Sequence, residues 1–468
     1  MLRLLPAHER DTVWDVLLPV GVTVLPPDLA RVDELLADPA LLAPFRSLWR
    51  ERDAASGRQA SSFGRPTIAM ATYVRLMVLR SRTGWGYATL VREVSDSLHL
   101  RRFCLIALSD PVPTESTVRK LTRRLGPELV AELIRGVITL ATRERRFAPR
   151  AVRTDSTVVE ADIRYPTDAG LAASGVRLLA RAGQRLAQAA GAKLVHVRDR
   201  SRAVGRRLRA MTRTLRRRTG EARTDVLRLT AEAGALLERS VREARRALTA
   251  ARSAAADRKA AVGQAIERLE LLIGQASTVV DQIGKRVRDE RISDRLVSFA
   301  DPDARPVRKG KIATPTQFGY VSQIAELTAS TKRGARGLIL PPVTRPGSVH
   351  ENELLPETVA ELRRLGLRPR EAVFDAGFGA RATRDELADL GTDVFVVGSA
   401  TNRGSRRTRR RLARYRVGAE GRIAHLKREY RAGRSRLRGA EGAATWENWA
   451  VLAYNVDTAA ALPLRRPG

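Results

Sequence analysis

This sequence of 468 residues is short of cysteine, of aromatic residues and of long apolar runs. Its single cysteine, Cys104, excludes a disulfide within the chain and any zinc site built from cysteine thiolates. Cys104 lies in the apolar stretch 103–108, which predicts that it is buried. No apolar run approaches the roughly 20 residues that a helix needs to cross a bilayer. The first ten residues are broken by Pro6 and Glu9 and do not form a secretory signal. These absences predict a cytoplasmic protein that does not interact with membranes.

Acidic residues are also few in comparison with basic ones. Lysine and arginine number 85, aspartate and glutamate number 51, and the net charge is +34 at pH 7. The positive electrostatic field of so basic a chain favours a polyanionic partner. Nucleic acid is the first candidate, because guanidinium groups pair bidentately with phosphate. A membrane surface is the alternative, but it would call for a basic amphipathic helix with bulky apolar anchors. A GC-rich genome would also raise the arginine content.

The length predicts about three domains of roughly 150 residues each. Residues 1–55 show short helical patterns, and a polar linker rich in small residues follows at 54–66. From residue 67 to about 147 the pattern is helical throughout. We therefore predict an N-terminal helical segment over 1–55 and an all-α DNA-binding domain over 56–147.

One helix in this second region is short, basic and rich in hydroxyl groups. Thr114 can cap it, and it is expected to end at Leu125, before a Gly-Pro pair. A helix of this kind after a turn is typical of the recognition helix of a helix-turn-helix unit. The alternative is an ordinary surface helix of an all-α module. The candidate DNA contacts on this helix are Arg119, Lys120 and Arg123.

The stretch from about 176 to 297 contains no proline and is rich in Ala, Arg, Leu and Glu. Apolar residues recur there every seven positions, in two sets three positions apart: Ile266, Ile273, Val280 and Val287 with Leu269, Ala276 and Ile283. A weaker seam lies upstream: Leu227, Val241 and Leu248 with Leu237, Ala244 and Ala251. Two such seams predict a helical hairpin that packs on itself. Coiled-coil pairing between chains is the alternative.

The beginning of this helical block is strongly basic. Residues 181–218 hold thirteen basic residues against one acid, Asp199. A solvated face is the usual explanation of such a run, but this imbalance indicates a nearby anion. We therefore predict phosphate contacts at Arg216, Arg217 and Arg218.

Segments typical of β-strands lie on both sides of the helical block. They are 151–159 before it and 317–326, 337–340, 372–374 and 393–397 after it, with helical stretches 356–365 and 382–390 between the later strands. This order predicts an α/β fold, a mixed sheet flanked by helices. The helical block is then a long coiled-coil-like insertion, 176–297, after the first strand. The sheet domain comprises 148–175 and 298–460, and 461–468 is a tail.

Three acidic residues stand at the edges of these elements. Asp155 lies in the first strand, Asp375 directly follows the strand 372–374, and Glu420 is expected to begin the last helix. Acids from separate elements can converge on one pocket, and carboxylate oxygens are the ligands that Mg²⁺ prefers. Two such ions about 3.5–4 Å apart can drive the in-line displacement of a phosphodiester.

Other residues compete for these roles. Glu160, Asp162 and Asp168 could be structural or could replace Asp155, and the competitors of Glu420 are Glu429, Glu441 and Glu447. Asp301 and Asp303 are expected to be turn residues. His425, Trp446 and Trp449 are expected to pack or to contact phosphate.

Glu420 follows a run of seven arginines between Arg406 and Arg416. Helical geometry places Arg416, Glu420 and Lys427 on one stripe about 16 Å long. A carboxylate flanked by cations suits a metal ion held beside a phosphate backbone, whereas the alternative is an exposed helix with an i,i+4 ion pair. The candidate phosphate contacts here are Arg406, Arg407, Arg409, Arg410, Arg416 and Lys427.

Several motifs, taken in order, resemble the DDE transposases of bacterial insertion sequences, ISNCY-type in particular. They are residues 155–163 with 165–168, 305–311, 315–320, 373–378, 420–430 and 434–455, and the resemblance covers roughly 60–460. Related transposases carry a Tyr-x2-Arg-x3-Glu-x6-Lys signature, of which Arg416, Glu420 and Lys427 supply three positions. Ala413 stands at the tyrosine position, and Tyr415 lies two residues further on.

The resemblance implies a ribonuclease H-like catalytic domain with Asp155, Asp375 and Glu420 as its metal-binding triad. It implies Mg²⁺ as cofactor, with Mn²⁺ as a substitute, and double-stranded DNA as partner: the terminal inverted repeats of the element and the target DNA. The expected activity is DNA cleavage and strand transfer by a homo-oligomer, a dimer or larger, in the bacterial cytoplasm at the nucleoid. The alternatives are an inactive or repurposed DNA-binding relative and a nuclease without strand transfer.

Overall fold

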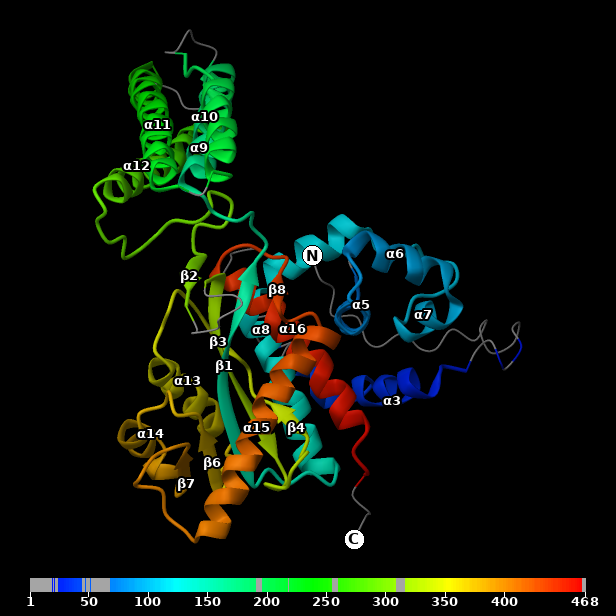
Figure 1. Ribbon diagram of the computed structural model, residues 1–468. Coiled ribbons are helices and arrows are strands. Elements are labelled where there is room, and N and C mark those ends of the chain that lie inside the picture. Colours follow the sequence, from blue (N-terminus) through cyan, green and yellow to red (C-terminus); the bar gives the residue numbers. More distant parts are fainter. Residues whose placement is uncertain are drawn as a thin grey trace. The chain divides into compact units, whose positions relative to one another are not determined.

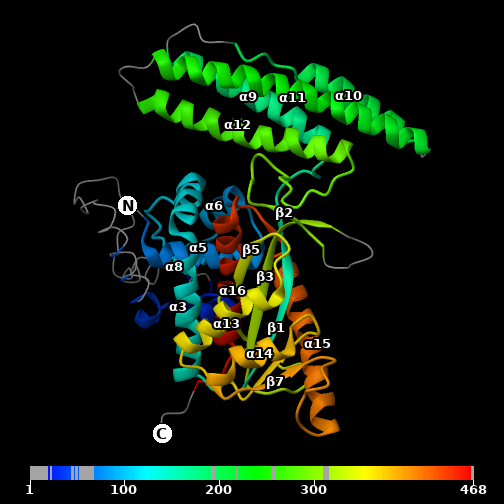
Figure 2. The same ribbon diagram turned by 90° about the vertical axis from the view of Figure 1, so that its left-hand side faces the viewer.

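The computed structural model describes residues 19, 21, 24–43, 47, 51, 68–190, 196–217, 219–254, 260–308 and 316–464. The chain forms two compact units, one of residues 1–162 with 320–468 and one of residues 163–319 (Figures 1 and 2). We call them the sheet unit and the helical unit. The predicted linker at 54–66 and the predicted phosphate contact Arg218 lie outside the described residues. Within the described part, no helix is long and apolar enough for a membrane span.

The N-terminal part of the sheet unit is helical, as predicted. Its helices are α3 (Pro27–Leu36), α5 (Met70–Thr83), α6 (Tyr87–Asp96), α7 (Leu98–Phe103) and α8 (Glu115–Glu144). Gly84 ends α5 in the left-handed region, at a φ of 72°. Helix α8 is interrupted where its first half was expected to end, because Gly126 has a φ of 72° and a ψ of 177°. Cys104 is fully buried, as predicted.

The helical unit consists of helices packed around one apolar core. They are α9 (Asp168–Ala190), α10 (Ser201–Leu215), α11 (Gly220–Ala254) and α12 (Ala260–Val287). The predicted hairpin is present as α11 and α12, and seam residues such as Leu269 and Ala276 are buried in it. The hairpin does not pack only on itself, because α9 and α10 also contribute to the core. The seam ends at Val287, which is 42% exposed.

The sheet is mixed, as predicted. Its strands are β1 (Ala151–Ala161), β2 (Arg305–Val307), β3 (Gln317–Thr328), β4 (Gly337–Ile339), β5 (Val343–Pro346), β6 (Glu371–Phe374), β7 (Asp393–Val396) and β8 (Arg434–Ser435). The main order is β2-β3-β1-β6-β7, while β4 and β5 pair with β3 and β8 pairs with β1. Strand β1 runs parallel to β6, and β6 runs parallel to β7. The sequence did not reveal β2, β5 and β8, which are too short to show a period.

The remaining helices of the sheet unit are α13 (Glu351–Arg364), α14 (Ala380–Glu386), the 3₁₀ turn η1 (Ala388–Leu390), α15 (Arg406–Glu429) and α16 (Ala440–Ala460). Successive side chains of a strand point to opposite faces of its sheet. Ala151 and Val373 accordingly pack with Leu412 of α15 in one core. Val152 and Ala372 belong to the other core, which α16 covers. Helix α15 therefore lies over one face of the sheet, as Figure 2 shows, and α16 over the other.

Candidate active site

The pairing of β1 with β6 brings two of the predicted acids together. Thr154 is the register partner of Phe374, so the next position of each strand aligns Asp155 with Asp375. Val373, two residues before Asp375, faces the α15 side of the sheet. Because strand side chains alternate, both aspartates also point toward α15.

Helix α15 carries the third acid and lies close to the sheet at this point. Ser405 caps its N-terminus by accepting a hydrogen bond from the Thr408 amide. A Cβ atom at Gly418, midway between Arg416 and Glu420, would overlap the guanidinium of Arg153 on β1. Glycine at position 418 is therefore what lets the helix approach the strand, a requirement that spacing in the sequence did not reveal.

The Arg416 guanidinium lies among all three predicted acids. Its Nη2 is 3.0 Å from Asp155 Oδ2 and 2.9 Å from Asp375 Oδ2, and its Nη1 is 2.6 Å from Glu420 Oε1. The Arg416 and Asp155 side chains are 12% and 11% exposed, whereas Glu420 is 62% exposed. The cluster is thus closed at Asp155 and open at Asp375, which is 37% exposed, and at Glu420. The Nε of Arg416 is buried, and no hydrogen-bond partner lies near it within the described residues.

The electrostatics of Asp155 reflect this position. Burial raises the pKa of its carboxyl group, the Arg416 guanidinium opposes that rise, and the charges of Asp375 and Glu351 add to it. The other oxygen of each aspartate is held by the backbone. The Ser156 amide donates to Asp155 Oδ1 at 2.8 Å, and the Ala376 amide donates to Asp375 Oδ1 at 2.7 Å.

The atoms of this cluster are of the type that a divalent cation prefers as ligands, because three carboxylate oxygens already surround one positive charge. Within the described ranges, no three acidic, histidine or cysteine side chains stand close enough together to form a metal cage by themselves. The Arg416 guanidinium lies between the three carboxylates and contacts each of them. Asp155, Asp375 and Glu420 could supply ligands to a metal ion only if the guanidinium moved out from among them.

The competing acids have other partners. Glu160 pairs with Arg434 at 3.2 Å, and Asp162 pairs with Arg436 at 3.2 Å. In the helical unit, Asp168 accepts a hydrogen bond from Arg295 at 2.7 Å. The Asp301 amide donates a hydrogen bond to the Ser298 hydroxyl oxygen at 3.2 Å, as expected in a turn.

Two of the competitors of Glu420 also have other partners. Glu429 pairs with the adjacent Arg428 at 2.7 Å. Glu447 is buried and accepts a hydrogen bond from Thr344 at 2.9 Å. The three remaining candidates pack within the fold, which is one of their two expected roles. His425 lies edge-on to Tyr430 and Tyr454, and Trp449 lies edge-on to Tyr73. The Trp446 indole donates to the Arg431 carbonyl.

Tyr415, two residues from the tyrosine position of the signature, belongs to the core. It is 1% exposed, and its hydroxyl lies 2.6 Å from Thr328 Oγ1 on β3. Lys427 is half-buried and donates to the Val158 carbonyl at 2.8 Å, so it also ties α15 to β1. By contrast, Arg406, Arg407, Arg409 and Arg410 are exposed at the start of α15.

A buried charge network beneath the site was not predicted. Arg153 of β1 and Arg422 of α15 both contact Glu326 of β3, at 2.6 and 2.9 Å. Arg153 also donates to the Tyr415 carbonyl at 3.0 Å, and all three charged side chains are less than a tenth exposed. The network joins the strand of Asp155 to the helix of Glu420. The available signal was a charged residue at an interior position of each of two apolar strands.

A fourth acid near the cluster was also missed. The Glu351 carboxylate, at the start of α13, lies over the turn that follows Asp375, since a Cβ at Gly377 would be 2.6 Å from Glu351 Oε2. Gln323 of β3 donates to the Glu351 carbonyl at 2.9 Å and fixes this end of α13. Nothing in the spacing of the sequence connected residue 351 with residues 155 and 375.

The predicted DNA contacts outside this cluster are exposed. Arg119, Lys120 and Arg123 lie on the first half of α8, where Arg119 also pairs with Glu115 at 3.5 Å. Arg216 and Arg217 follow α10. They extend an exposed stripe of that helix whose members recur at helical spacing: Arg202, Arg206, Arg209 and Arg213. Among the residues that the structure describes, no carboxylate forms an ion pair with a member of this stripe.

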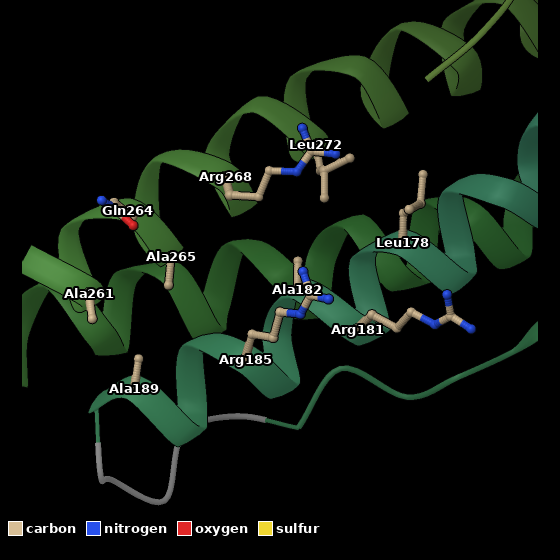
Figure 3. Close-up of a pocket in the computed structure, with 10 residues that line it drawn as sticks. All are labelled: Leu178, Arg181, Ala182, Arg185, Ala189, Ala261, Gln264, Ala265, Arg268 and Leu272. Atoms are coloured by element: carbon tan, nitrogen blue, oxygen red, sulfur yellow. The ribbon is translucent and has the colours of Figure 1, made fainter. Parts of the chain in front are cut away.

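The helical unit also contains a basic groove between α9 and α12, with a volume of about 410 Å³. Figure 3 shows Arg181 and Arg185 from α9 and Arg268 from α12 at its edges, over a floor that includes Ala182, Ala265 and Leu272. Guanidinium groups around an apolar floor suit an anion that also carries an apolar part.

Two family models match the chain. Residues 334–456 match the family described as "Transposase DDE domain", and residues 29–124 match the family described as "Transposase domain (DUF772)". No curated protein and no solved structure shows significant similarity to this chain. The matches support a DDE transposase domain whose mixed sheet is of the ribonuclease H-like kind, preceded by N-terminal helices and a long helical region. The predicted fold class is thereby confirmed. Asp375 and Glu420 lie within the first match, and Asp155 precedes it.

Proposed function

We propose that this chain, which carries a DDE transposase domain, is an active transposase that binds the terminal inverted repeats of its own element. The reaction would be hydrolysis of a phosphodiester at each element end, followed by attack of the freed 3′ hydroxyl on target DNA. The observation that supports it best is the meeting of Asp155 from β1, Asp375 from the turn after β6 and Glu420 from α15 at one cation. The insertion-sequence group and a bacterial source stay predictions.

The three acids would have different roles in the site. Asp155 and Asp375 are fixed by the β1–β6 register and by one backbone hydrogen bond each, so they form the rigid side of the site. Glu420 is more exposed and forms the adjustable side. When bound there, Mg²⁺ or Mn²⁺ would supply activation of the attacking oxygen and stabilisation of the leaving one.

DNA would be held by exposed arginines that have no acidic partner among the residues that the structure describes. The stripe on α10 runs from Arg202 to Arg216 over about 21 Å of helix, and the start of α15 adds Arg406, Arg407, Arg409 and Arg410. Such contacts fix the position of DNA without reading its bases. Arg119, Lys120 and Arg123 of α8 are the candidates for base contacts. Transposition by two-ended cleavage also favours a dimer or larger assembly on DNA.

The test uses the DNA that flanks this reading frame. Asp155→Asn and Asp375→Asn should keep binding to the inverted repeats but lose Mg²⁺-dependent cleavage by at least about a thousandfold, because only the charge of a metal ligand changes. Asp162→Asn is the matched control, since Asp162 pairs with Arg436 outside the cluster. Full cleavage by either cluster variant would remove that residue from the site.

The same assay separates the alternatives. A protein that binds the repeats but nicks them in neither Mg²⁺ nor Mn²⁺ would be an inactive or repurposed relative. Nicked products without joined products in a plasmid integration assay would indicate a nuclease. Joined products require the complete reaction.

A further inference from the structure

The position of Arg416 raises a question that the proposed function does not answer. This arginine occupies the centre of a cluster that is expected to hold a metal ion. Three acids this close repel one another, and a cation among them reduces that repulsion. The contacts come from β1, from the turn after β6 and from α15 itself, so one side chain links all three elements.

We propose that Arg416 is a positioning residue that takes the place of the metal. Its guanidinium holds Asp155, Asp375 and Glu420 together before a divalent cation enters, and it gives up that place when the cation binds. This inference rests on the proposed function, because it concerns the same metal-binding acids.

The hydrogen bonds of Asp155 and Asp375 explain why the Arg416 guanidinium and a metal ion would compete for the same carboxylate oxygens. In both aspartates, Oδ1 accepts a backbone amide, from Ser156 or from Ala376. Oδ2 of each aspartate is the oxygen that Arg416 Nη2 contacts. The Oδ2 atoms are therefore the carboxylate oxygens without a backbone hydrogen bond here, and a metal ion that took them would have to displace the guanidinium.

Charge favours this exchange. Three carboxylates and one guanidinium leave a net charge of about −2, so the cluster still attracts a divalent cation. A released guanidinium keeps all its donors, and guanidinium groups pair well with phosphate. The surface of α15 next to the site is already rich in exposed arginines. Arg416 would thus hold the acids in the free protein and contact DNA once metal is bound.

The experiment measures metal binding rather than turnover. Mn²⁺ binding by the full chain is followed by calorimetry, for the wild type, Arg416→Gln, Arg416→Lys and the control Arg414→Gln. Arg414 is an exposed arginine on the same helix, so its replacement makes the same change in net charge. Arg416→Gln should bind Mn²⁺ about tenfold more tightly or better, and Arg414→Gln should change the affinity less than about threefold.

Thermal melting gives an independent readout. Without metal, Arg416→Gln should melt at a lower temperature than the wild type, because the acids lose their shared cation. Saturating Mn²⁺ should raise its melting temperature more than that of the wild type, since tighter binding stabilises the folded state more. Arg416→Lys keeps the positive charge but loses the two separate nitrogen donors with which the guanidinium contacts the acids. Its Mn²⁺ affinity should therefore lie between those of the wild type and Arg416→Gln.

The outcomes are distinguishable. If Arg416→Gln does not fold, tighter Mn²⁺ binding by Arg416→Lys supports the exchange, and unchanged or weaker binding overturns it. Unchanged or weaker binding by a folded Arg416→Gln overturns the exchange while leaving the metal site in place. Absence of Mn²⁺ binding in every variant, the wild type included, overturns the metal site of the proposed function itself.

Discussion

The buried arginines of the sheet unit and the exposed arginines of the helical unit have opposite roles. In the sheet unit, Arg153 and Arg416 are largely buried, and each contacts a carboxylate on another element. In the helical unit, Arg206, Arg209 and Arg213 follow one exposed stripe of α10. The large positive net charge of the chain is therefore not a single property. Part of it is neutralised inside the fold, and part of it faces outward.

The difference follows from the cost of burying charge. A buried arginine is tolerated only with a carboxylate and further hydrogen-bond acceptors around it, so each such residue fixes the elements that supply them. An exposed arginine needs no partner, because water solvates it. Arginines of the first kind assemble the candidate site, and those of the second kind are available to a polyanion.

The largest effect is expected where a buried partner is removed. Glu326→Gln leaves Arg153 and Arg422 without their carboxylate, and we expect it to lower the free energy of unfolding by about 3–5 kcal/mol. Tryptophan fluorescence during urea denaturation can follow this change, because all five tryptophans belong to the sequence of the sheet unit. A loss below about 1 kcal/mol would show that the network contributes little.

The matched control for this change lies in the helical unit. Glu232 pairs with Arg207 at 3.1 Å and with Arg228 at 2.8 Å, and these side chains are 30–61% exposed. Glu232→Gln removes an acid from two arginines there, as Glu326→Gln does in the sheet unit. We expect a loss below about 1 kcal/mol, because exposed ion pairs are screened by water. Far-ultraviolet circular dichroism can follow this unfolding.

The sequence predicts local patterns better than it predicts contacts between residues that are far apart in the chain. Periodicity predicted the α11–α12 hairpin and the main strands, because repeated apolar positions leave a local pattern. It also placed Arg416 and Glu420 on one helical face. It could not find the pairing of Arg153 with Glu326, which are 173 positions apart, or the alignment of Asp155 with Asp375. Both depend on strand register, which no single segment specifies.

A second prediction concerns a buried acid that lacks an arginine. Burial raises the pKa of Glu447 to about 7, opposed by the hydrogen bond from Thr344. Its folded pKa lies above the ordinary value of 4.5, so its contribution to stability is complete below pH 4.5 and is lost as the pH rises to about 7. Glu447→Gln, which cannot ionise, should therefore avoid this loss.

The measurement compares the two proteins at two pH values. Relative to the wild type, Glu447→Gln should gain about 2–3 kcal/mol of unfolding free energy between pH 4.5 and pH 8. Urea denaturation at both pH values gives this difference. An equal difference at both values would mean that Glu447 ionises in the folded protein as readily as in the unfolded one.

The smallest effect on stability, and the clearest effect on DNA binding, is expected on α10. Replacing Arg206, Arg209 and Arg213 with glutamine should change the free energy of unfolding by less than about 0.5 kcal/mol, because these residues are exposed. If they neutralise phosphates, the slope of log affinity against log salt should flatten by up to about 2.7, since each contact contributes about 0.9 on duplex DNA. The control removes three exposed arginines that already have acidic partners, Arg228, Arg252 and Arg288. Equal flattening in both triple variants would mean that the slope reports net charge alone, and an unchanged slope in the α10 variant would mean that the stripe faces solvent or a protein partner.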